Sequence, residues 1–497
     1  MISAFLSRKT GAEHPVPQIN GTEDQQQAVN EIHHQFHVTT EKARTIVKQF
    51  MEEMQKGLDH EGATGIKVKT IKLLLYINLE QVPMIPSFVT GRPNGDEKGK
   101  YLALDLGGTN LRVCEFELKG DGQFSVHQQK YVVAEELKTG EMRRLCDFIA
   151  DCVDNFVTEY GSDRAHTTEK LQLGFTFSFA VNQTDINRGT LMHWTKGFNC
   201  SGAINKDVVI MLQDAFLRKN IHVNIAALVN DTVGTLMANA YRRPDTSMGI
   251  ILGTGTNAAY YEKLKNIKKW RGGEQVFEEM VVNMEWGAFD RERRVLPLTV
   301  YDNKLDRESI NPREQLFEKM MSGMYLGEIS RNAILQFVDH RVLFNGLSSP
   351  DLNKQWGFET SYMSTIVDDD SSDLEEVRHV LEDTLQIPFT TLGDRHVVKV
   401  ICIAVGRRAA RLAACGVAGV LAHTGELDAD SVVAIDGSVY EFFPNFEKYM
   451  MEALEELFGD QVTKHIKFSL ARDGSGFGAA MIAMMAHKAA LVKSNAI

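Results

Sequence analysis

Two segments with the same alternation of apolar runs and glycine turns lie far apart in this chain. The first is YLALDLGGTNLRVCEFELKGDGQFSV (101–126) and the second is MGIILGTGTNAAYYEKL (248–264). Their turns, LGGTN and LGTGTN, are separated by 147 residues, counted from Thr109 to Thr256. Strand-like runs around Gly-rich turns predict an antiparallel meander in the first segment and a hairpin in the second. We therefore expect two α/β lobes, each opening with a hairpin, in a duplicated nucleotide-clamp architecture.

The rest of the chain alternates between helix and strand patterns. Apolar residues at helical spacing predict helices over 24–60, 134–160, 206–219, 313–345 and 397–423, with Thr39 or Thr40 as an N-cap in the first range. Apolar runs predict strands over 171–181 and 222–231, and 432–444 reads as strand, turn and helix start. The acidic run VDDDSSDLEEV (367–377) is interpreted as a solvated loop rather than a metal loop, with Ser372 and Glu375 forming a capping box.

Charge, cysteine usage and hydropathy limit the partners and the cellular location that the sequence allows. The formal charge of −12 over 497 residues argues against nucleic acid or an anionic membrane as the main partner. Six scattered cysteines without a C-x-x-C pair indicate reduced thiols, and no apolar run reaches 18 residues, so no transmembrane segment is predicted. The expected location is the cytosol. A weak amphipathic anchor at residues 1–7, for instance on a mitochondrial surface, is the alternative.

The loop DLGGTN (105–110) has the composition of a phosphate-binding turn. Glycines let the backbone approach a polyphosphate closely, and their N–H groups can point at its oxygens. Asp105 would repel bare phosphate, so its use implies a cation such as Mg²⁺, which takes one or two carboxylates together with substrate phosphates and water. No G-x-x-x-x-G-K-[ST] sequence is present, which excludes a P-loop. The later DGSGFGAA (473–480) is interpreted as close helix packing at a hinge or clamp.

Polar residues interrupt several otherwise apolar segments. In IAALVNDTVGTLMA (225–238), Asp231 follows a run in which an uncompensated carboxylate would cost several kcal/mol. Alternating hydroxyl, amide and carboxylate groups are what a polyhydroxylated ligand requires. Such misplaced residues are Ser178, Thr195, Lys196, Asn230, Asp231, Asn257, Glu285 and Glu318.

Nearly the whole chain, from about residue 25 to 490, resembles the eukaryotic hexokinase family, including fungal hexokinases and glucokinases. The resemblance rests on LALDLGGTNLRV, LGFTFSF, WTKGF, VNDTVGTL, ILGTGTNAAYY, MEWGAF, LFEKMMSGMYLGE and DGSGFGAA, in this order and spacing. It implies an actin-like ATPase (ribonuclease H-like) α/β fold with two lobes and a cleft between them. The implied division is 1–95 as an N-terminal helical part of the large lobe, 96–232 as the small lobe, 233–469 as the large lobe, and 470–497 as a return to the small lobe.

The resemblance also implies ATP-dependent phosphorylation of a hexose (glucose, with mannose and fructose as further candidates) at its 6-hydroxyl, the first step of glycolysis. It makes Asp231 the catalytic base and Lys196 a second catalytic residue. Residues implied to line the sugar are Ser178, Phe179, Thr195, Lys196, Asn230, Asp231, Asn257, Glu285 and Glu318. Residues implied to bind the nucleotide are Asp105, Leu106, Gly107, Gly108, Thr109, Asn110, Lys130, Thr254, Gly323, Met324, Gly437 and Ser438. Mg²⁺ would be held mainly through ATP and water near Asp105 and Asp231, without a dedicated protein metal site.

Two other functions stay open at this point. One is a catalytically weak hexokinase-like sugar sensor or regulator, and the other is a chaperone or filament-type ATPase on the same clamp. Intact Asp231, Lys196, Asp105 and Gly-Thr turns favour an active enzyme, while Ala180, where the family usually has Pro, loosens the substrate loop. A monomer or a homodimer is expected.

Overall fold

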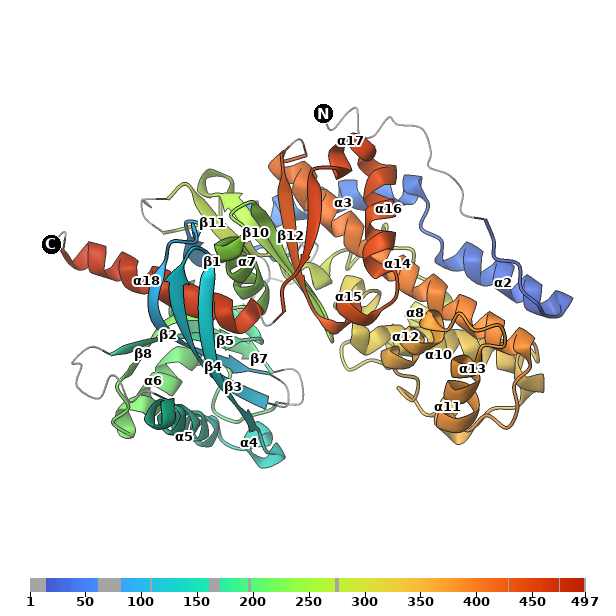
Figure 1. The fold of residues 1–497 in the computed structure, drawn as a ribbon, viewed down its shortest axis with the longest axis horizontal. Helices are drawn as coiled ribbons and strands as arrows, with labels where there is room; N and C mark the ends of the chain where they lie inside the picture. Colours follow the sequence, from blue (N-terminus) through green and yellow to red (C-terminus); the bar gives the residue numbers. More distant parts are fainter. Residues whose placement is uncertain are drawn as a thin grey trace, which may run out of the picture.

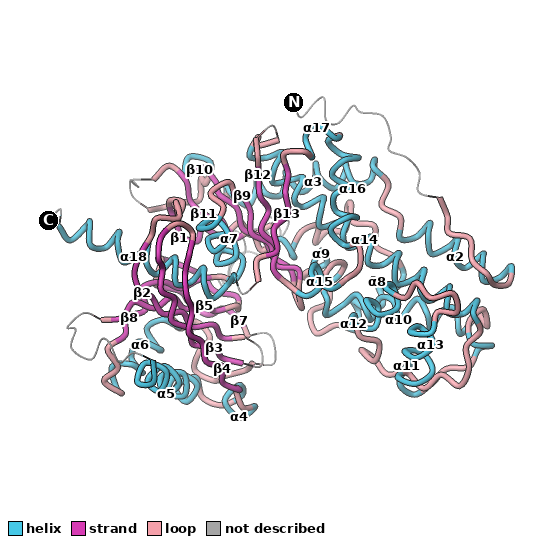
Figure 2. Tube along the Cα trace, viewed as in Figure 1, coloured by secondary structure: helices cyan, strands magenta, loops and turns pink. Residues whose placement is uncertain are grey.

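The protein consists of two lobes, each built around its own β-sheet (Figure 1; Figure 2). The computed structural model describes residues 15–60, 82–107, 110–160, 170–194, 198–272, 277–427, 429–472 and 474–495. The expectations for residues 1–14, Gly108, Thr109, Thr195 and Lys196 lie outside the described residues.

The sheet of the small lobe has the order β4-β3-β2-β5-β8. Strands β2 (Lys98–Leu106), β3 (Asn110–Gly120) and β4 (Gln123–Val132) form the predicted antiparallel meander, and β5 (Leu171–Phe177) and β8 (Val223–Val229) continue the sheet in parallel. Helices α4 (Glu135–Thr139), α5 (Met142–Tyr160) and α6 (Val208–Arg218) belong to this lobe, where α5 and α6 share one core cluster with the sheet. Helix α18 (Gly474–Asn495) packs on strands of the same sheet.

The sheet of the large lobe repeats this plan. Its order is β1-β11-β10-β9-β12-β13, with β11 (Glu279–Asn283), β10 (Thr256–Lys263) and β9 (Thr246–Leu252) antiparallel, and β12 (Ser431–Asp436) and β13 (Ile466–Leu470) added in parallel. Strand β1 (Ile85–Thr90) extends it at the edge. Three antiparallel strands followed by two parallel ones in both sheets confirm the predicted duplication.

Helices form the rest of the large lobe around α14 (Leu392–Thr424), which is buried along most of its length. A capping box of Thr391 and Asp394 starts α14, and Gly425 ends it with φ +77°. The other helices of this lobe are α2 (Glu23–Phe36), α3 (Thr40–Asp59), α8 (Val300–Glu308), α9 (Leu316–Lys319), α10 (Gly323–Asp339), α11 (Pro350–Asn353), α12 (Thr360–Asp368), α13 (Glu375–Arg378), α15 (Ser438–Phe442), α16 (Phe446–Phe458) and α17 (Asp460–Thr463). Thr39 caps α3 as expected, and no helix in the described part of the chain is long and apolar enough to cross a membrane.

Two details differ from the sequence-based expectations. The strand expected over 171–181 ends at Phe177, and Ala180 instead starts β6 (Ala180–Asp185), which pairs with β7 (Arg188–His193) in a separate ribbon. The Ser372–Glu375 capping box is wrong, because α13 begins after Leu374, which has φ +51° and makes no side-chain cap. The carboxylate of Asp369 accepts the N–H groups of Ser371 and Val377 instead, and this turn chemistry competes with the simple cap.

Helix α7 (Asp231–Arg242) crosses α18 at a point where only glycine fits. A Cβ on Gly478 would lie 1.9 Å from the carbonyl oxygen of Gly234. The sheets approach the same two helices through glycines: a Cβ on Gly174 in β5 would lie 2.0 Å from the carbonyl oxygen of Ala479, and one on Gly249 in β9 would lie 2.6 Å from that of Thr232. Close helix packing, predicted for DGSGFGAA, is therefore confirmed. The expected lobe boundary between residues 232 and 233 falls inside α7.

Two acidic residues, Glu53 in α3 and Asp290 in the segment after β11, lie next to each other. Glu53 in α3 is buried, and its Oε2 accepts the N–H of Asp290 at 3.3 Å. The carboxylate of Asp290 accepts three further N–H groups, from Arg294, Val295 and Leu296. Burial raises the pKa of Glu53 to about 7.

We predict that Gly478→Ala destabilises the protein by about 3 kcal/mol, because the added methyl group meets backbone that cannot turn away. The matched control is Gly476→Ala in the same helix, where the nearest atom to an added Cβ is 4.0 Å away. That substitution should be neutral or stabilise by up to about 1 kcal/mol through helix propensity. Urea unfolding of both variants is the measurement, and equal stability of the two would contradict the account of the crossing.

We also predict that Glu53→Gln flattens the pH dependence of stability. The pKa of Glu53 is about 7 in the folded protein and 4.5 in the unfolded chain. Its contribution to the free energy of unfolding is therefore complete below pH 4.5 and is lost as the pH rises through about 7. The loss amounts to at most about 3 kcal/mol. Unfolding free energies of the wild type and the variant between pH 5 and 8.5 should converge at low pH and separate at high pH. Parallel curves would mean that Glu53 titrates normally.

Candidate active site

The ends of four segments meet at one edge of the small-lobe sheet. Asp105 lies near the end of β2, and its Oδ2 accepts Nη2 of Arg112 at 2.6 Å and Oγ of Ser475 at 3.4 Å. The hydroxyl of Thr176, in β5, donates to the carbonyl of Ser475 at the start of α18. Because β2, β5 and β8 are parallel, their carboxyl ends share this edge, which is where α/β sheets bind ligands.

Asp231 is the first residue of α7, and only Asn230 separates it from the end of β8. It is half-buried, and its Oδ1 accepts the N–H of Thr232 at 2.9 Å. Asn230 is the N-cap, and its side-chain oxygen accepts both the N–H and the hydroxyl of Thr232. The positive end of the helix dipole and the N–H of Thr232 offset the cost of holding the Asp231 carboxylate among apolar neighbours.

The polar residues of the large lobe form a connected network. Nδ2 of Asn257 donates to Oδ1 of Asn283 at 2.7 Å and to Oε1 of Glu285 at 3.2 Å, and Nδ2 of Asn283 donates to the same Glu285 oxygen at 2.9 Å. Glu318 accepts the N–H of Thr256 at 3.0 Å. The structure thus brings the predicted residues Asn257 and Glu285 together and places Glu318 beside the same turn.

An aromatic cluster fixes the backbone beneath this network. Glu285 has φ +55°, and the next residue, Trp286, is fully buried with its Nε1 donating to the hydroxyl of Thr256 at 3.0 Å. The rings of Phe50 and Phe317 pack against Trp286 and each other, and Phe289 packs against both of these phenylalanines. Glycines of α14 make room, since a Cβ on Gly416 would lie 2.7 Å from the Trp286 ring.

The start of α7 and the polar network lie on neighbouring elements. Gly249 of β9 contacts the backbone of Thr232, and two residues further along β9 Ile251 pairs with Asn257. The base candidate and the network are therefore held by the same helix–strand contact.

The segment after β5, which carries the predicted sugar residues Ser178 and Phe179, is anchored by aromatic side chains. Ser178 is half-buried, whereas the ring of Phe179 is only 7% exposed and packs against Phe177, Trp194 and Phe198. The Phe179 side chain therefore belongs to the core, which leaves its backbone for any ligand contact.

The predicted nucleotide residues divide into two groups. In the small lobe, Asp105, Arg112 and Lys130 are paired in one row across β2, β3 and β4, so Lys130 lies near the predicted phosphate turn. In that turn the N–H of Gly107 donates to the carbonyl of Asn110 at 3.0 Å. Leu106 is fully buried, so its side chain contributes to the core and not to a site.

The second group lines a pocket of about 550 Å³ in the large lobe. Gly437 adjoins it with φ +128°, and a Cβ there would lie 2.3 Å from the carbonyl of Leu252, so only glycine fits. The lining residues include the predicted Thr254, Gly323, Met324 and Ser438, together with Trp356, Phe358, Glu359, Thr360, Ser361, Ser364, Val439, Phe442 and Phe443. A pocket of this volume accommodates a ligand of nucleoside size.

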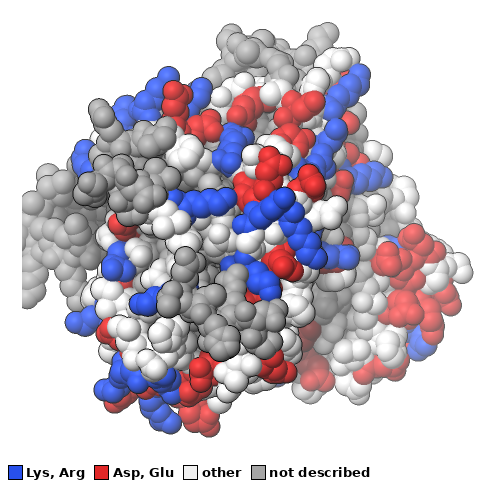
Figure 3. Space-filling model, turned by 60° about the vertical axis from the view of Figure 1, so that its left-hand side comes forward, with Lys and Arg blue, Asp and Glu red and all other residues white. Residues whose placement is uncertain are grey.

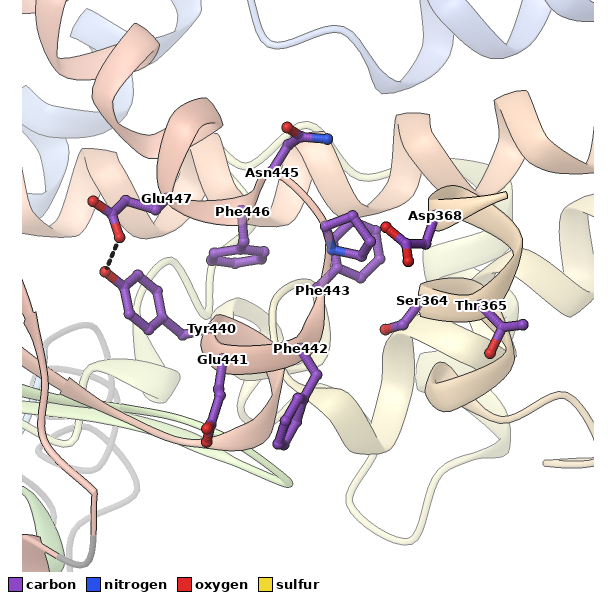
Figure 4. Close-up of a pocket in the computed structure, with 11 residues that line it drawn as sticks. Ser364, Thr365, Asp368, Tyr440, Glu441, Phe442, Phe443, Asn445, Phe446 and Glu447 are labelled. Carbon is purple, nitrogen blue, oxygen red and sulfur yellow. Dashed lines mark hydrogen bonds between the residues drawn. The ribbon is translucent and has the colours of Figure 1, made fainter. Parts of the chain in front are cut away.

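A neighbouring pocket of about 490 Å³ has a different character (Figure 4). Its lining includes the carboxylates of Asp368, Glu441 and Glu447, the last of which accepts the hydroxyl of Tyr440 at 2.6 Å. Carboxylates would repel a polyphosphate, so we assign no nucleotide to this second pocket.

The described residues contain no group of three or more His, Cys, Asp or Glu side chains that could hold a metal ion. On the face of the molecule shown in Figure 3, Lys and Arg side chains are interspersed with Asp and Glu. Asp105 lies near the end of β2, and Asp231 lies just after the end of β8.

Sequence reasoning missed three residues of this region. Arg112 provides the cation beside Asp105 that was expected from Mg²⁺ alone, and its position opposite Asp105 in the hairpin was the available signal. Asn283, an amide at the end of the apolar strand VVN, links two predicted residues. Trp356 lies in a connector whose contact with the pocket no local pattern reveals.

Comparison with known proteins places this architecture in a family. Two family models, both described as hexokinase, match residues 28–241 and 247–485 and so divide the chain between α7 and β9. A glucokinase of Aspergillus niger is 40% identical over 91% of this chain and 96% of its own length, and a hexokinase of Kluyveromyces lactis is 41% identical over 91% and 90%. The structure of a hexokinase from Schistosoma mansoni complexed with glucose is 34% identical, has a TM-score of 0.79, and covers 93% of this chain and 99% of its own. Both family models and these relatives show that the chain belongs to the hexokinase family.

Proposed function

We propose that this protein transfers the γ-phosphoryl group of ATP to the 6-hydroxyl of a hexose, with Asp231 as the base. The observation that supports this role is the position of Asp231, at the N-terminus of α7 and beside the converging ends of β2, β5 and β8. A carboxylate at this position can accept the hydroxyl proton as the oxygen attacks phosphorus.

The sugar is held by groups that offer both donors and acceptors. Glu285 and Glu318 accept hydrogen bonds from sugar hydroxyls, Asn230 and Asn257 offer amide groups, and Ser178 approaches from the small lobe. Thr195 and Lys196 complete the proposed set, with Lys196 as a cationic group near the transferred phosphoryl.

The nucleotide spans both lobes in this proposal. Its phosphates face the turn of Gly107 to Asn110, with Arg112 and Lys130 in the adjoining row, and its nucleoside lies toward Thr254, Gly323, Met324, Gly437 and Ser438. Bound Mg²⁺ would neutralise charge on the phosphates. The single carboxylates Asp105 and Asp231 fit an ion held mainly through phosphates and water. Closure of the lobes around the sugar would exclude water.

Asp231→Ala tests the base. We expect kcat to fall about 10²- to 10⁴-fold, since positioned bases contribute this much, while glucose affinity changes little. A coupled assay with glucose, mannose or fructose and MgATP measures turnover, and calorimetry measures binding. Asp214→Ala, at an exposed position of α6, is the control and should keep full activity. Near-normal turnover of the Asp231 variant would overturn the assignment, and a wild type that binds glucose without turnover would favour a sensor.

Asn283→Ala tests the network. Loss of its amide removes a hydrogen bond to the Glu285 carboxylate and one to Asn257, so we expect the KM for the sugar to rise about 10- to 100-fold. The KM for MgATP should stay the same. Asn30→Ala, on the exposed face of α2, is the matched control. An unchanged sugar KM in the Asn283 variant would show that the network forms without it.

A further inference from the structure

Trp356 has a backbone conformation that is unusual for a large side chain. Its φ is +64°, in the left-handed region that bulky residues rarely adopt, and its side chain is 37% exposed while lining the 550 Å³ pocket. Strain of this kind persists where the surrounding structure enforces it and clusters at ligand sites.

A buried ion pair enforces this conformation. The N–H of Trp356 donates to Oε2 of Glu328 at 2.8 Å, and Glu328 is bridged by Arg331 through two bonds of 2.7 and 2.6 Å. Arg331 also donates to the carbonyl of Leu352 at 3.0 Å. Glu328 and Arg331 are both buried in α10, so the connector that carries Trp356 is fastened to the helix that forms the pocket wall.

The pocket offers apolar surface, and two of the five hydroxyl side chains that line it are already hydrogen-bonded within the protein. Met324 is 48% exposed at the start of α10, and the edge of the Tyr325 ring supports Trp356 at 6.1 Å between centroids. The Thr360 hydroxyl already donates to the carbonyl of Gly323 and accepts the N–H of Gly327, and that of Ser361 donates to Glu359. Trp356 and Met324 therefore offer a ligand apolar surface to pack against.

We propose that Trp356 is the platform on which the nucleobase of the phosphoryl donor stacks, with Met324 as the other apolar contact. This inference rests on the proposed function, because it assigns the base end of the nucleotide in that site. Aromatic side chains bind bases of any identity through their π-faces, and thioethers pack well against them.

The test measures the affinity of MgADP by calorimetry in Trp356→Ala and Trp356→Phe. Typical stacking energies convert to a roughly 5- to 100-fold higher Kd for the Ala variant, and the Phe variant should stay within about 3-fold of the wild type. Glucose affinity and the melting temperature should be unchanged. The control is Phe389→Ala, which removes an aromatic side chain that is 67% exposed and lies outside the pocket lining.

Fluorescence gives a second readout that does not depend on the Ala variant folding. The chain has four tryptophans, and MgADP should quench the emission of the wild type but not that of Trp356→Phe. The proposal would be overturned if a folded Trp356→Ala variant bound MgADP as tightly as the wild type. It would also be overturned if MgADP quenched the emission of Trp356→Phe as much as that of the wild type. MgADP affinity that depends on Trp356, in a wild type that phosphorylates no hexose, would support the stacking role of Trp356. The same result would contradict the proposed function.

Discussion

The backbone contact between α7 and α18 at Gly234 and Gly478 is the constraint on which the two-lobed arrangement depends. Each sheet reaches this helix pair through its own glycine, Gly174 from the small lobe and Gly249 from the large lobe. A side chain at any of these four positions would meet backbone, so the lobes would be forced apart. The same contact sets the site, because the N-termini of the two helices carry Asp231 and Ser475.

The carboxylates of the site are stabilised by nearby hydrogen-bond donors rather than by exposure to water. Asp231 has the helix N-terminus and the N–H of Thr232, and Asp105 has the guanidinium of Arg112 and the hydroxyl of Ser475. In the large lobe, Glu285 is held by two amides over a buried indole. Preorganised groups of this kind need little reorganisation when charge develops during phosphoryl transfer.

The fold could be predicted largely because its signals are local. Glycine turns between apolar runs marked both hairpins, and DGSGFGAA marked the helix contact, although its partner Gly234 lies far away in sequence. Side-chain roles that depend on tertiary pairing could not be read in this way. Asn283 acquires its role from Asn257 across two strands, and Trp356 acquires its role from a buried ion pair in α10.

The wrong capping box also has a tertiary cause. Ser372 and Glu375 fit the capping pattern, but Asp369 takes the available N–H groups and shifts the start of the helix. The side chains of Leu106 and Phe179, two residues of the predicted site, face the core, which leaves their backbone for any ligand contact.

The most direct test is a crystal structure of the protein with glucose and a non-hydrolysable MgATP analogue. The account predicts that the lobes turn about the glycine contact and that the Asp231 carboxylate lies about 3 Å from the sugar 6-hydroxyl, opposite the terminal phosphorus. A 6-hydroxyl that points elsewhere, with no carboxylate within hydrogen-bonding distance, would contradict it.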